Sequence, residues 1–200
     1  MFIYDDNFLT DQEIGYVQNV FEKTQNIWRY SPSSVQSDHD NYQTIIRGDQ
    51  YSDSPFFFVD ADFDNDLKSM SKVLIDKFTI KNNIKYNQIL RIRFNINPSY
   101  HDEIITFPHV DSTNPHYVFL YYVNDSSGDT IIYNKKYGEL IGNDMSIMHR
   151  ITPKKGSAFI MDGRHFHSVC IPTDGSLRKV INANLFSINA IKNEKSEAKK

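Results

Sequence analysis

Apolar residues recur at helical spacing in two stretches of the N-terminal half of the chain. In the first stretch they are Ile14, Val17, Val20 and Phe21, and this spacing predicts a helix that packs on a core. Thr10 and Glu13 precede them at the spacing of a capping box. A second helix is predicted over Asp62–Lys81, where the apolar positions are Leu67, Met70, Val73, Leu74, Ile75 and Phe78.

From Tyr86 onward the pattern alternates, which is typical of strands. Ile89, Ile92 and Phe94 interleave with arginine and asparagine and predict one strand; another is predicted at Met1–Tyr4. Further strands are predicted at Ile104–Val110, Tyr117–Val123, Thr130–Tyr133, Ser157–Met161, His165–Ile171 and Lys179–Ile188, with Asn-Pro and Asp-Gly turn signals between them. Helices followed by many short strands predict an α+β fold whose core is a jelly roll, or double-stranded β-helix, supported by the N-terminal helices.

Length and composition favour one domain. The chain has 200 residues, and we predict a single domain over residues 1–191 with a charged, disordered tail at 192–200. The polar stretches Ser31–Asp53 and Asn134–Arg150 are predicted to be loops, either lids over a site or plain surface.

Charge and cysteine content exclude several classes of protein. The formal net charge is -3 and no basic stripe is present, which disfavours a nucleic-acid partner. Cys170 is the single cysteine, so the chain cannot form an internal disulfide. We expect a cytoplasmic protein without a signal peptide or membrane span. No pattern predicts an oligomeric state.

The strongest chemical signal is a histidine and an aspartate two positions apart. Alternate residues of a strand point the same way, so His109 and Asp111 could bind one metal ion from a single strand. A third ligand would come from a distant strand. Two imidazoles and one carboxylate on one face of an octahedral ion leave positions open for substrate, and this facial triad is diagnostic of non-heme Fe(II) oxygenases.

Two histidines compete for the place of the third ligand. His165 and His167 share one predicted strand and one parity, so either could face the metal. We favour His167, because an apolar stretch follows it, whereas His165 lies nearer a turn and is expected at the rim. His116 and His149 lie in turn-like surroundings, and His39 is expected to be a solvated loop residue.

An arginine follows the third ligand at a suitable distance. Iron centres of this kind use an organic acid as a source of electrons, and the distal carboxylate of that acid needs a cation. Arg178 comes soon after His167, with a turn at Asp174-Gly175 between the two strands. Alternation places Arg178, Val180, Asn182 and Asn184 on one face of its strand.

These residues resemble the Fe(II)/2-oxoglutarate-dependent dioxygenases, and most of all the prolyl 4-hydroxylase-like branch. The segments that carry the resemblance occur in the family's order along most of the chain. They are Asp6–Asp11, Phe107–Asp111, Tyr121–Asp125, Ser127–Thr130, Pro153–Phe159, His167–Val169 and Gly175–Arg178.

The resemblance implies a role for each matched residue. It implies His109, Asp111 and His167 as iron ligands, Arg178 as the partner of the 2-oxoglutarate distal carboxylate, and Tyr122 as a tyrosine that assists the arginine. Phe94 falls where relatives often have a cosubstrate-binding tyrosine; Ser127 and Asp129 replace a glycine and a glutamate of the family.

The reaction implied is hydroxylation of an unactivated C–H bond. Its cofactors are Fe(II), 2-oxoglutarate and O₂, with ascorbate as an optional addition, and its co-products are succinate and CO₂. A peptidyl prolyl residue is the substrate that the resemblance favours. The alternatives are a small-molecule or free amino acid hydroxylase on the same scaffold and a non-catalytic metal-binding jelly-roll module; a nucleic-acid demethylase is disfavoured.

Overall fold

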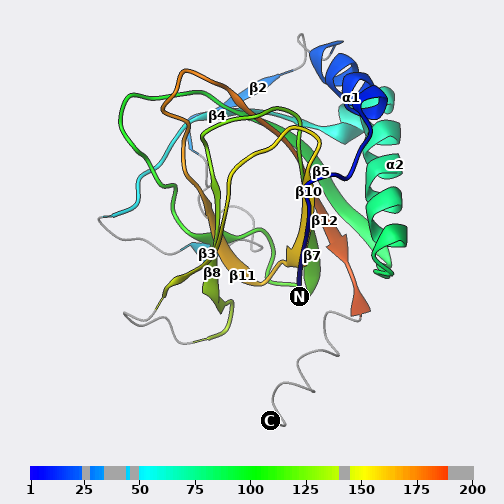
Figure 1. Cartoon of the computed structure of the whole chain (residues 1–200). Helices are drawn as coiled ribbons and strands as arrows, with labels where there is room; N and C mark the ends of the chain where they lie inside the picture. The colour runs from blue at the N-terminus through cyan, green and yellow to red at the C-terminus, as the bar shows by residue number, and fades with distance from the viewer. Residues whose placement is uncertain (24–27, 34–43, 46–49, 140–144, 189–200) are drawn as a thin grey trace.

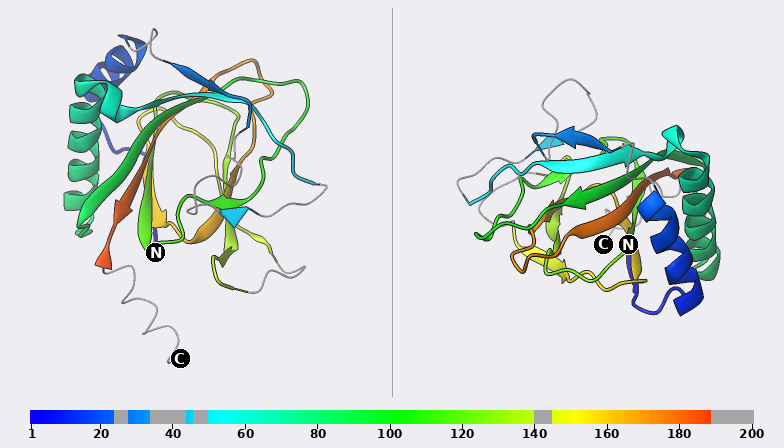
Figure 2. Two further views of the ribbon diagram at one scale, coloured as in Figure 1. Left: turned by 180° about the vertical axis from the view of Figure 1, so that it is seen from behind. Right: turned by 90° about the horizontal axis from the view of Figure 1, so that it is seen from above.

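The computed structural model describes residues 1–23, 28–33, 44–45, 50–139 and 145–188, and this part of the chain consists of two facing β-sheets and two α-helices. The predicted tail at 192–200 lies outside the described residues, as does His39. Figure 1 shows the two helices against one side of the larger sheet, and Figure 2 shows the smaller sheet on the opposite side.

The larger sheet has seven strands in the order β1-β10-β7-β12-β5-β4-β2. Every neighbouring pair is antiparallel. The strands are β1 Phe2–Asp5, β2 Arg29–Ser31, β4 Phe56–Asp60, β5 Gln88–Asn97, β7 His116–Tyr122, β10 Ala158–Asp162 and β12 Arg178–Phe186. The two long strands β5 and β12 pair along nearly their whole length, and residues of both line one side of the space between the sheets.

The smaller sheet has five strands in the order β3-β6-β11-β8-β9, also antiparallel. The strands are β3 Thr44–Ile45, β6 His109–Val110, β8 Thr130–Lys136, β9 Ile147–Ile151 and β11 His165–Val169. Strands far apart in sequence are therefore neighbours: β6 lies directly beside β11.

Helix α1, Asp11–Lys23, begins with the predicted capping box. The Thr10 backbone N–H donates to Glu13 at 2.9 Å, and the Glu13 N–H donates to the Thr10 hydroxyl at 3.4 Å. Helix α2, Asn65–Lys81, follows a short 3₁₀ turn at Ala61–Phe63 and is capped by Asp64, which accepts from two backbone N–H groups. No helix in the described part of the chain is long and apolar enough to span a membrane.

Alternation along the strands separates a core beneath the helices from a space between the sheets. On β7, Tyr117, Phe119 and Tyr121 pack into the core beneath the helices. Val118 and Leu120 point the other way and belong to the cluster between the sheets. Because both faces of β7 are covered, the whole strand is buried.

The α+β jelly roll with supporting helices is confirmed, with differences in the bounds of several elements. The predicted strand Ile104–Val110 is reduced to β6, His109–Val110, so Asp111 lies just beyond the end of the strand rather than on it. The second helix begins three residues later than predicted, because Asp64 caps it. Strands β2, β3 and β4 were not predicted, and β9 falls within the predicted Asn134–Arg150 loop. β9 is an edge strand with mostly exposed side chains, so it shows no clear alternation.

Candidate metal centre

The pairing of β6 with β11 brings His109 and His167 together, since these two residues face each other across the strands. Their ring centroids are 4.6 Å apart. Asp111 Oδ1 lies 3.8 Å from His109 Nε2 and 3.9 Å from His167 Nε2. One ligand atom from each of the three residues lies within 4.8 Å of the other two, which suits a single ion between them.

The two imidazoles are held with Nε2 free for a ligand. Nδ1 of His109 bonds to the Phe107 carbonyl at 3.0 Å, and Nδ1 of His167 bonds to the His165 carbonyl at 3.1 Å. Because Nδ1 donates to a carbonyl, the lone pair of each neutral ring is on Nε2. Burial and the neighbouring His109 lower the pKa of His167 to about 4, so this ring is neutral near pH 7.

The Asp111 carboxylate is held by its second oxygen. Oδ2 accepts from Asn182 Nδ2 at 3.3 Å and lies 3.3 Å from Arg91 Nη2. The hydrogen-bond network orients the Asn184 amide so that its nitrogen donates to Oδ2 at 2.9 Å and its oxygen accepts from Arg91 at 3.2 Å. Burial opposes ionisation, but the attraction of Arg91 and the histidines holds the pKa of Asp111 well below its usual range. Oδ1 is left facing the two rings.

His165 does not belong to this cluster, although it shares the parity of His167. The register of β11 against β8 shifts between the two histidines, which is a β-bulge. The residue that faces His109 across the β6–β11 pairing is His167, so His167 and not His165 completes the cluster. His165 instead bonds through Nδ1 to the Tyr133 carbonyl at 2.9 Å.

His116 and His149 also lie outside the cluster of three ligands. The His149 ring stacks on Phe2 at a centroid distance of 4.0 Å. His116 is buried, bonds to the Asn114 carbonyl through Nδ1, and packs so closely on Gly163 that a Cβ there would lie 2.2 Å from Nε2. His116 is therefore held by packing with its free nitrogen against the backbone.

A cavity of about 900 Å³ lies between the two sheets and contains the three clustered side chains on its wall. The predicted face of β12 lines it, with Arg178, Val180, Asn182 and Asn184. β5 contributes its odd-numbered residues from Arg91 to Asn97, and β7 and β10 contribute an apolar wall. Ser31–Ser33, from the stretch predicted to be a loop, also line the cavity.

Arg178 is buried at the other end of the cavity, with 2% of its surface exposed. Its N–H groups donate to the Gly128 carbonyl at 2.9 Å, to Thr130 Oγ1 at 2.7 Å and to Asn97 Oδ1 at 3.2 Å. All three acceptors are neutral, and no carboxylate pairs with this arginine in the described part of the chain. Burial lowers the pKa of the guanidinium, which marks the cost of a buried cation without an anion.

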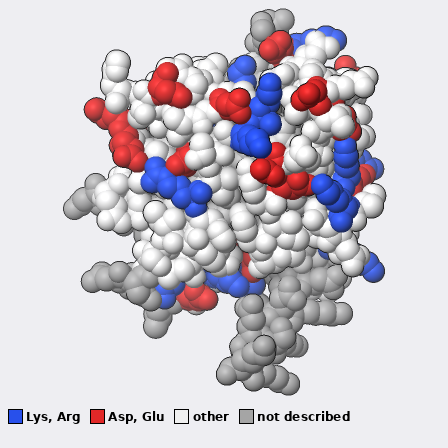
Figure 3. All heavy atoms as spheres, in the orientation of Figure 1, with Lys and Arg blue, Asp and Glu red and all other residues white. Residues whose placement is uncertain are grey.

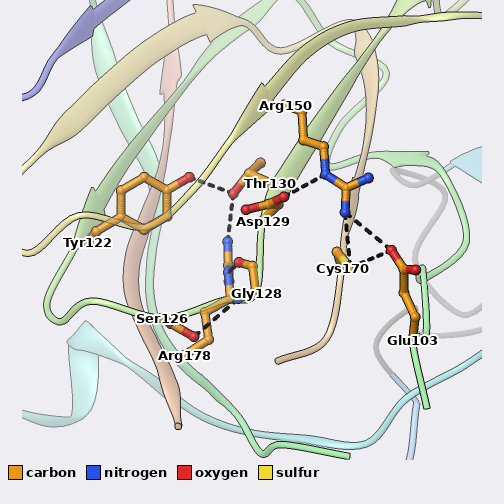
Figure 4. A network of polar contacts seen from close by, with 9 residues as sticks. All are labelled: Glu103, Tyr122, Ser126, Gly128, Asp129, Thr130, Arg150, Cys170 and Arg178. Carbon is orange, nitrogen blue, oxygen red and sulfur yellow. Dashed lines mark hydrogen bonds and ion pairs between the residues drawn. The ribbon is translucent and has the colours of Figure 1, made fainter. Parts of the chain in front are cut away.

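Tyr122 lies beside this arginine, as Figure 4 shows. Its hydroxyl bonds to Thr130 Oγ1 at 2.7 Å, and the guanidinium of Arg178 lies 5.8 Å from the ring centroid. Burial raises the pKa of Tyr122 to about 12, so its hydroxyl stays protonated and can donate. Tyr122 and Arg178 thus share the Thr130 hydroxyl as a hydrogen-bond partner.

The segment that supports Arg178 is fixed from both sides. A Cβ at Gly128 would lie 2.8 Å from Pro172 and 2.9 Å from the Cys170 carbonyl, so only glycine fits this approach. Asp129, the residue that departs from the family pattern, points away from the cavity and pairs with Arg150 at 2.5 Å (Figure 4). The aspartate therefore anchors the segment between Gly128 and Thr130.

The comparison of Phe94 with a cosubstrate-binding tyrosine is wrong on geometric grounds. Phe94 is fully buried in the core beneath the helices and packs on Phe21 at 5.6 Å. A tyrosine there would not reach the cavity, because the odd-numbered residues of β5 face it. Sequence reasoning did not assign Arg91, Asn95 and Asn97 to the site, although the alternation of this strand places them on one face. Which residues contact them depends on the pairing with other strands, which the alternation does not give.

Comparisons with known proteins place the fold. No family model matches the sequence, and no curated protein sequence matches it. A prolyl hydroxylase from Trichoplax adhaerens, solved with a peptide fragment of the hypoxia inducible factor oxygen degradation domain, superposes with a TM-score of 0.60 and 15% identity, over 94% of this chain and 84% of that chain. The chain has the fold of the 2-oxoglutarate- and Fe(II)-dependent oxygenases.

Two further structures extend the likeness. A prolyl-4-hydroxylase from Pseudomonas putida gives a TM-score of 0.56 and 10% identity, over 93% of this chain and 92% of that chain. The epimerase SnoN, solved with Fe³⁺, alpha ketoglutarate and nogalamycin RO, gives 0.60 and 10%, over 93% and 78%. At these identities the likeness concerns the fold, and the chemistry must be argued from the side chains of this chain.

Proposed function

We propose that this protein is an Fe(II)- and 2-oxoglutarate-dependent dioxygenase that hydroxylates an unactivated C–H bond. The observation that carries the proposal is one cavity with a His-Asp-His cluster at one end and a buried arginine without a carboxylate partner in the described residues at the other. His109 and His167 would hold the metal through Nε2, and Asp111 would hold it through Oδ1. A ligand set of two histidines and one carboxylate would leave room for a cosubstrate and O₂ at the same ion.

The donor set fits 2-oxoglutarate as well as iron. Arg178 donates hydrogen bonds to three neutral acceptors, and no carboxylate in the described part of the chain neutralises its buried positive charge. A dicarboxylic acid that reaches from the metal to Arg178 supplies the missing anion, and Thr130 offers its hydroxyl beside the guanidinium. The hydrogen bond between the hydroxyls of Tyr122 and Thr130 keeps the Thr130 side chain in place.

Bound iron, with 2-oxoglutarate and O₂, supplies the oxidising power that no side chain of the protein has, and succinate and CO₂ are the co-products. The residues of the chain bind and orient. Arg91, Asn182 and Asn184 fix the Asp111 carboxylate, while the apolar wall of Val118 and Leu120 keeps water from the reacting carbon.

For the substrate we propose a peptidyl prolyl residue. Two structures of the same fold are prolyl hydroxylases, and one of them was solved with a peptide. A small-molecule or free amino acid substrate is the second candidate, because the fold also occurs in an epimerase solved with nogalamycin RO. On the face in Figure 3, acidic and basic side chains are interspersed without an extended basic patch. This face therefore gives no support to a nucleic-acid partner.

The proposal is tested by metal binding and by turnover. We expect the protein to bind one equivalent of Co(II) under calorimetry and to form succinate from 2-oxoglutarate with Fe(II) and O₂. His167→Ala should weaken Co(II) binding by roughly 100-fold or more and abolish succinate formation, because loss of a residue that merely supports a ligand already costs about 10- to 100-fold and His167 is itself a proposed ligand. His165→Ala is the matched control and should bind Co(II) like the wild type.

Two outcomes would overturn the assignment. One is succinate formation that does not depend on added Fe(II). The other is loss of Co(II) binding in His165→Ala with retention in His167→Ala. Proline-containing peptides and free amino acids, added to the same succinate assay, then separate the two substrate candidates.

A further inference from the structure

The cavity carries more positive charge than the proposed cofactors need. Its charged side chains, apart from histidine and within the described residues, are Arg91, Arg93, Arg178 and Asp111. A divalent metal and a dianionic 2-oxo acid cancel each other, and Asp60 pairs with Arg93 at 2.8 Å from just outside the lining. One positive charge therefore remains on the wall of the cavity, and a bound anion would compensate it.

The surplus charge lies at the metal end, not at the Arg178 end. Arg178 is opposite Asn97 in the β12·β5 register, whereas Arg91 is opposite Asn184. Six residues of extended strand separate these levels, which is about 20 Å between backbones. Because Arg91 contacts the Asp111 carboxylate, a group bound to Arg91 lies immediately beside the metal ligands.

Hydrogen-bonding capacity is unused at the same place. The described part of the chain has six buried side-chain polar atoms without a partner, and three of them belong to cavity residues: Arg91 Nε, Asn95 Oδ1 and Asn182 Oδ1. An N–H donor of Arg91 and an acceptor of Asn182 are thus both unsatisfied next to Asp111. Buried polar atoms normally find partners, so this pair indicates a ligand with an acceptor and an N–H group.

An apolar surface lies at the same level of the cavity. Val118 is opposite Asn184, and Leu120 is opposite Asn182, in the β7·β12 register. Both line the cavity together with Met161 from β10, which is opposite Val118. The metal end therefore has a cation, a hydrogen-bond acceptor and an apolar wall, all at two neighbouring levels of the sheet.

We propose that the substrate carries a carboxylate a few bonds from the oxidised carbon, and that Arg91 binds it. This inference rests on the proposed function and narrows its substrate class to carboxylic acids with a small apolar body. The carboxylate has two sources: the α-carboxylate of a free amino acid such as proline, or the side chain of an acidic residue next to a prolyl residue in a peptide. In either case Asn182 accepts from a substrate N–H.

The test is calorimetric binding to protein loaded with Co(II) and 2-oxoglutarate without O₂, so no turnover is needed. One arm compares L-proline with L-prolinamide; the other compares blocked Asp-Pro with blocked Asn-Pro dipeptides. We expect the acidic member of one pair to bind roughly 10- to 100-fold more tightly, as for a charge-assisted hydrogen bond. The arm that shows the preference identifies the source of the carboxylate.

Variants of the cavity arginine complete the experiment. Arg91→Gln should abolish the preference, and Arg91→Lys should retain most of it, because lysine keeps the charge. Arg29→Gln, at an exposed arginine of β2 outside the cavity lining, is the matched control and should bind like the wild type. Each variant is first shown to bind Co(II).

Equal binding within both pairs, no binding of either acid at millimolar concentration, or a preference that survives in Arg91→Gln would each overturn the inference. These results leave the proposed function standing if Co(II) and 2-oxoglutarate still bind. Failure of the wild type to bind Co(II) or 2-oxoglutarate would instead overturn the proposed function itself.

Discussion

Arg178 gives the sharpest prediction, because its role can be separated from that of the metal. Its guanidinium is buried and has neutral acceptors on three sides, Gly128, Thr130 and Asn97. The distal carboxylate of 2-oxoglutarate would complete the set. Arg178→Gln removes the positive charge, shortens the side chain and leaves this carboxylate unpaired in the cavity.

The magnitude follows from burial. Truncating one partner of a buried, hydrogen-bonded charge pair costs 2–5 kcal/mol in general, and we take about 3 kcal/mol for this site. That corresponds to roughly 100-fold weaker binding of 2-oxoglutarate. The acid 2-oxopentanoate has the same chain length and the same keto-acid end but no distal carboxylate, so its affinity should not change.

The assay is a calorimetric titration of both acids into protein loaded with Co(II). The wild type should prefer 2-oxoglutarate roughly 100-fold, and Arg178→Gln should bind both acids equally. Arg150→Gln is the matched control: Arg150 pairs with Asp129 behind the same segment and does not line the cavity (Figure 4). The reasoning would be refuted if Arg178→Gln still preferred 2-oxoglutarate, or if its affinity for both acids fell by the same factor.

Two further predictions concern the scaffold. Gly128→Ala should lower the free energy of unfolding by about 1–3 kcal/mol and weaken 2-oxoglutarate binding, because its Cβ collides with Pro172. Gly15→Ala, at an exposed position of helix α1 with open space around it, should raise the free energy of unfolding by about 0.5–1 kcal/mol in chemical denaturation; a change of the same sign in both variants would contradict this. Burial would raise the pKa of Asp162, but hydrogen bonding to Arg164 outweighs this and lowers the pKa to about 2. Above its usual pKa the ionised carboxylate therefore adds about 2 kcal/mol to the free energy of unfolding, and this contribution is lost as the pH falls toward 2. In acid denaturation Asp162→Asn should lack this loss, and a pH profile identical to that of the wild type would exclude the effect.

The parts of the fold that the sequence predicted are those with strong periodicity. Helix α1 and its capping box, helix α2 and the long strands β5 and β12 combine a clear period with turn signals at their ends. Strands β2 and β9 lie at sheet edges with mostly exposed side chains, so burial imposes no alternation on them. β2 forms only by pairing with β4, and β9 only by pairing with β8, and neither pairing can be seen in the sequence of the edge strand itself.

The candidate site was predictable where a role depends on residue type and spacing along one strand. His109 and Asp111 were found from their spacing, and the alternation of β12 correctly placed Arg178, Asn182 and Asn184 on one face. Parity could not decide between His165 and His167, because the deciding feature is the register that places His167 opposite His109 across β6. Periodicity within one strand contains no information about the register with a strand that is distant in sequence.

Arg91 illustrates what spacing cannot supply. In sequence it is one of two arginines in an alternating strand, and such residues are usually exposed to solvent. The pairing of β12 with β5 brings Asn184 to it, and the packing of the smaller sheet over the larger brings Asp111. A cation beside a divalent metal repels it, so the arrangement is stable only if anions outnumber the metal's charge. Asp111 supplies one of them and the keto-acid end of the 2-oxo acid a second, which together offset the metal, while the distal carboxylate of the acid offsets Arg178. The charge of Arg91 still requires a further anion, and the substrate is the component of the reaction left to provide it.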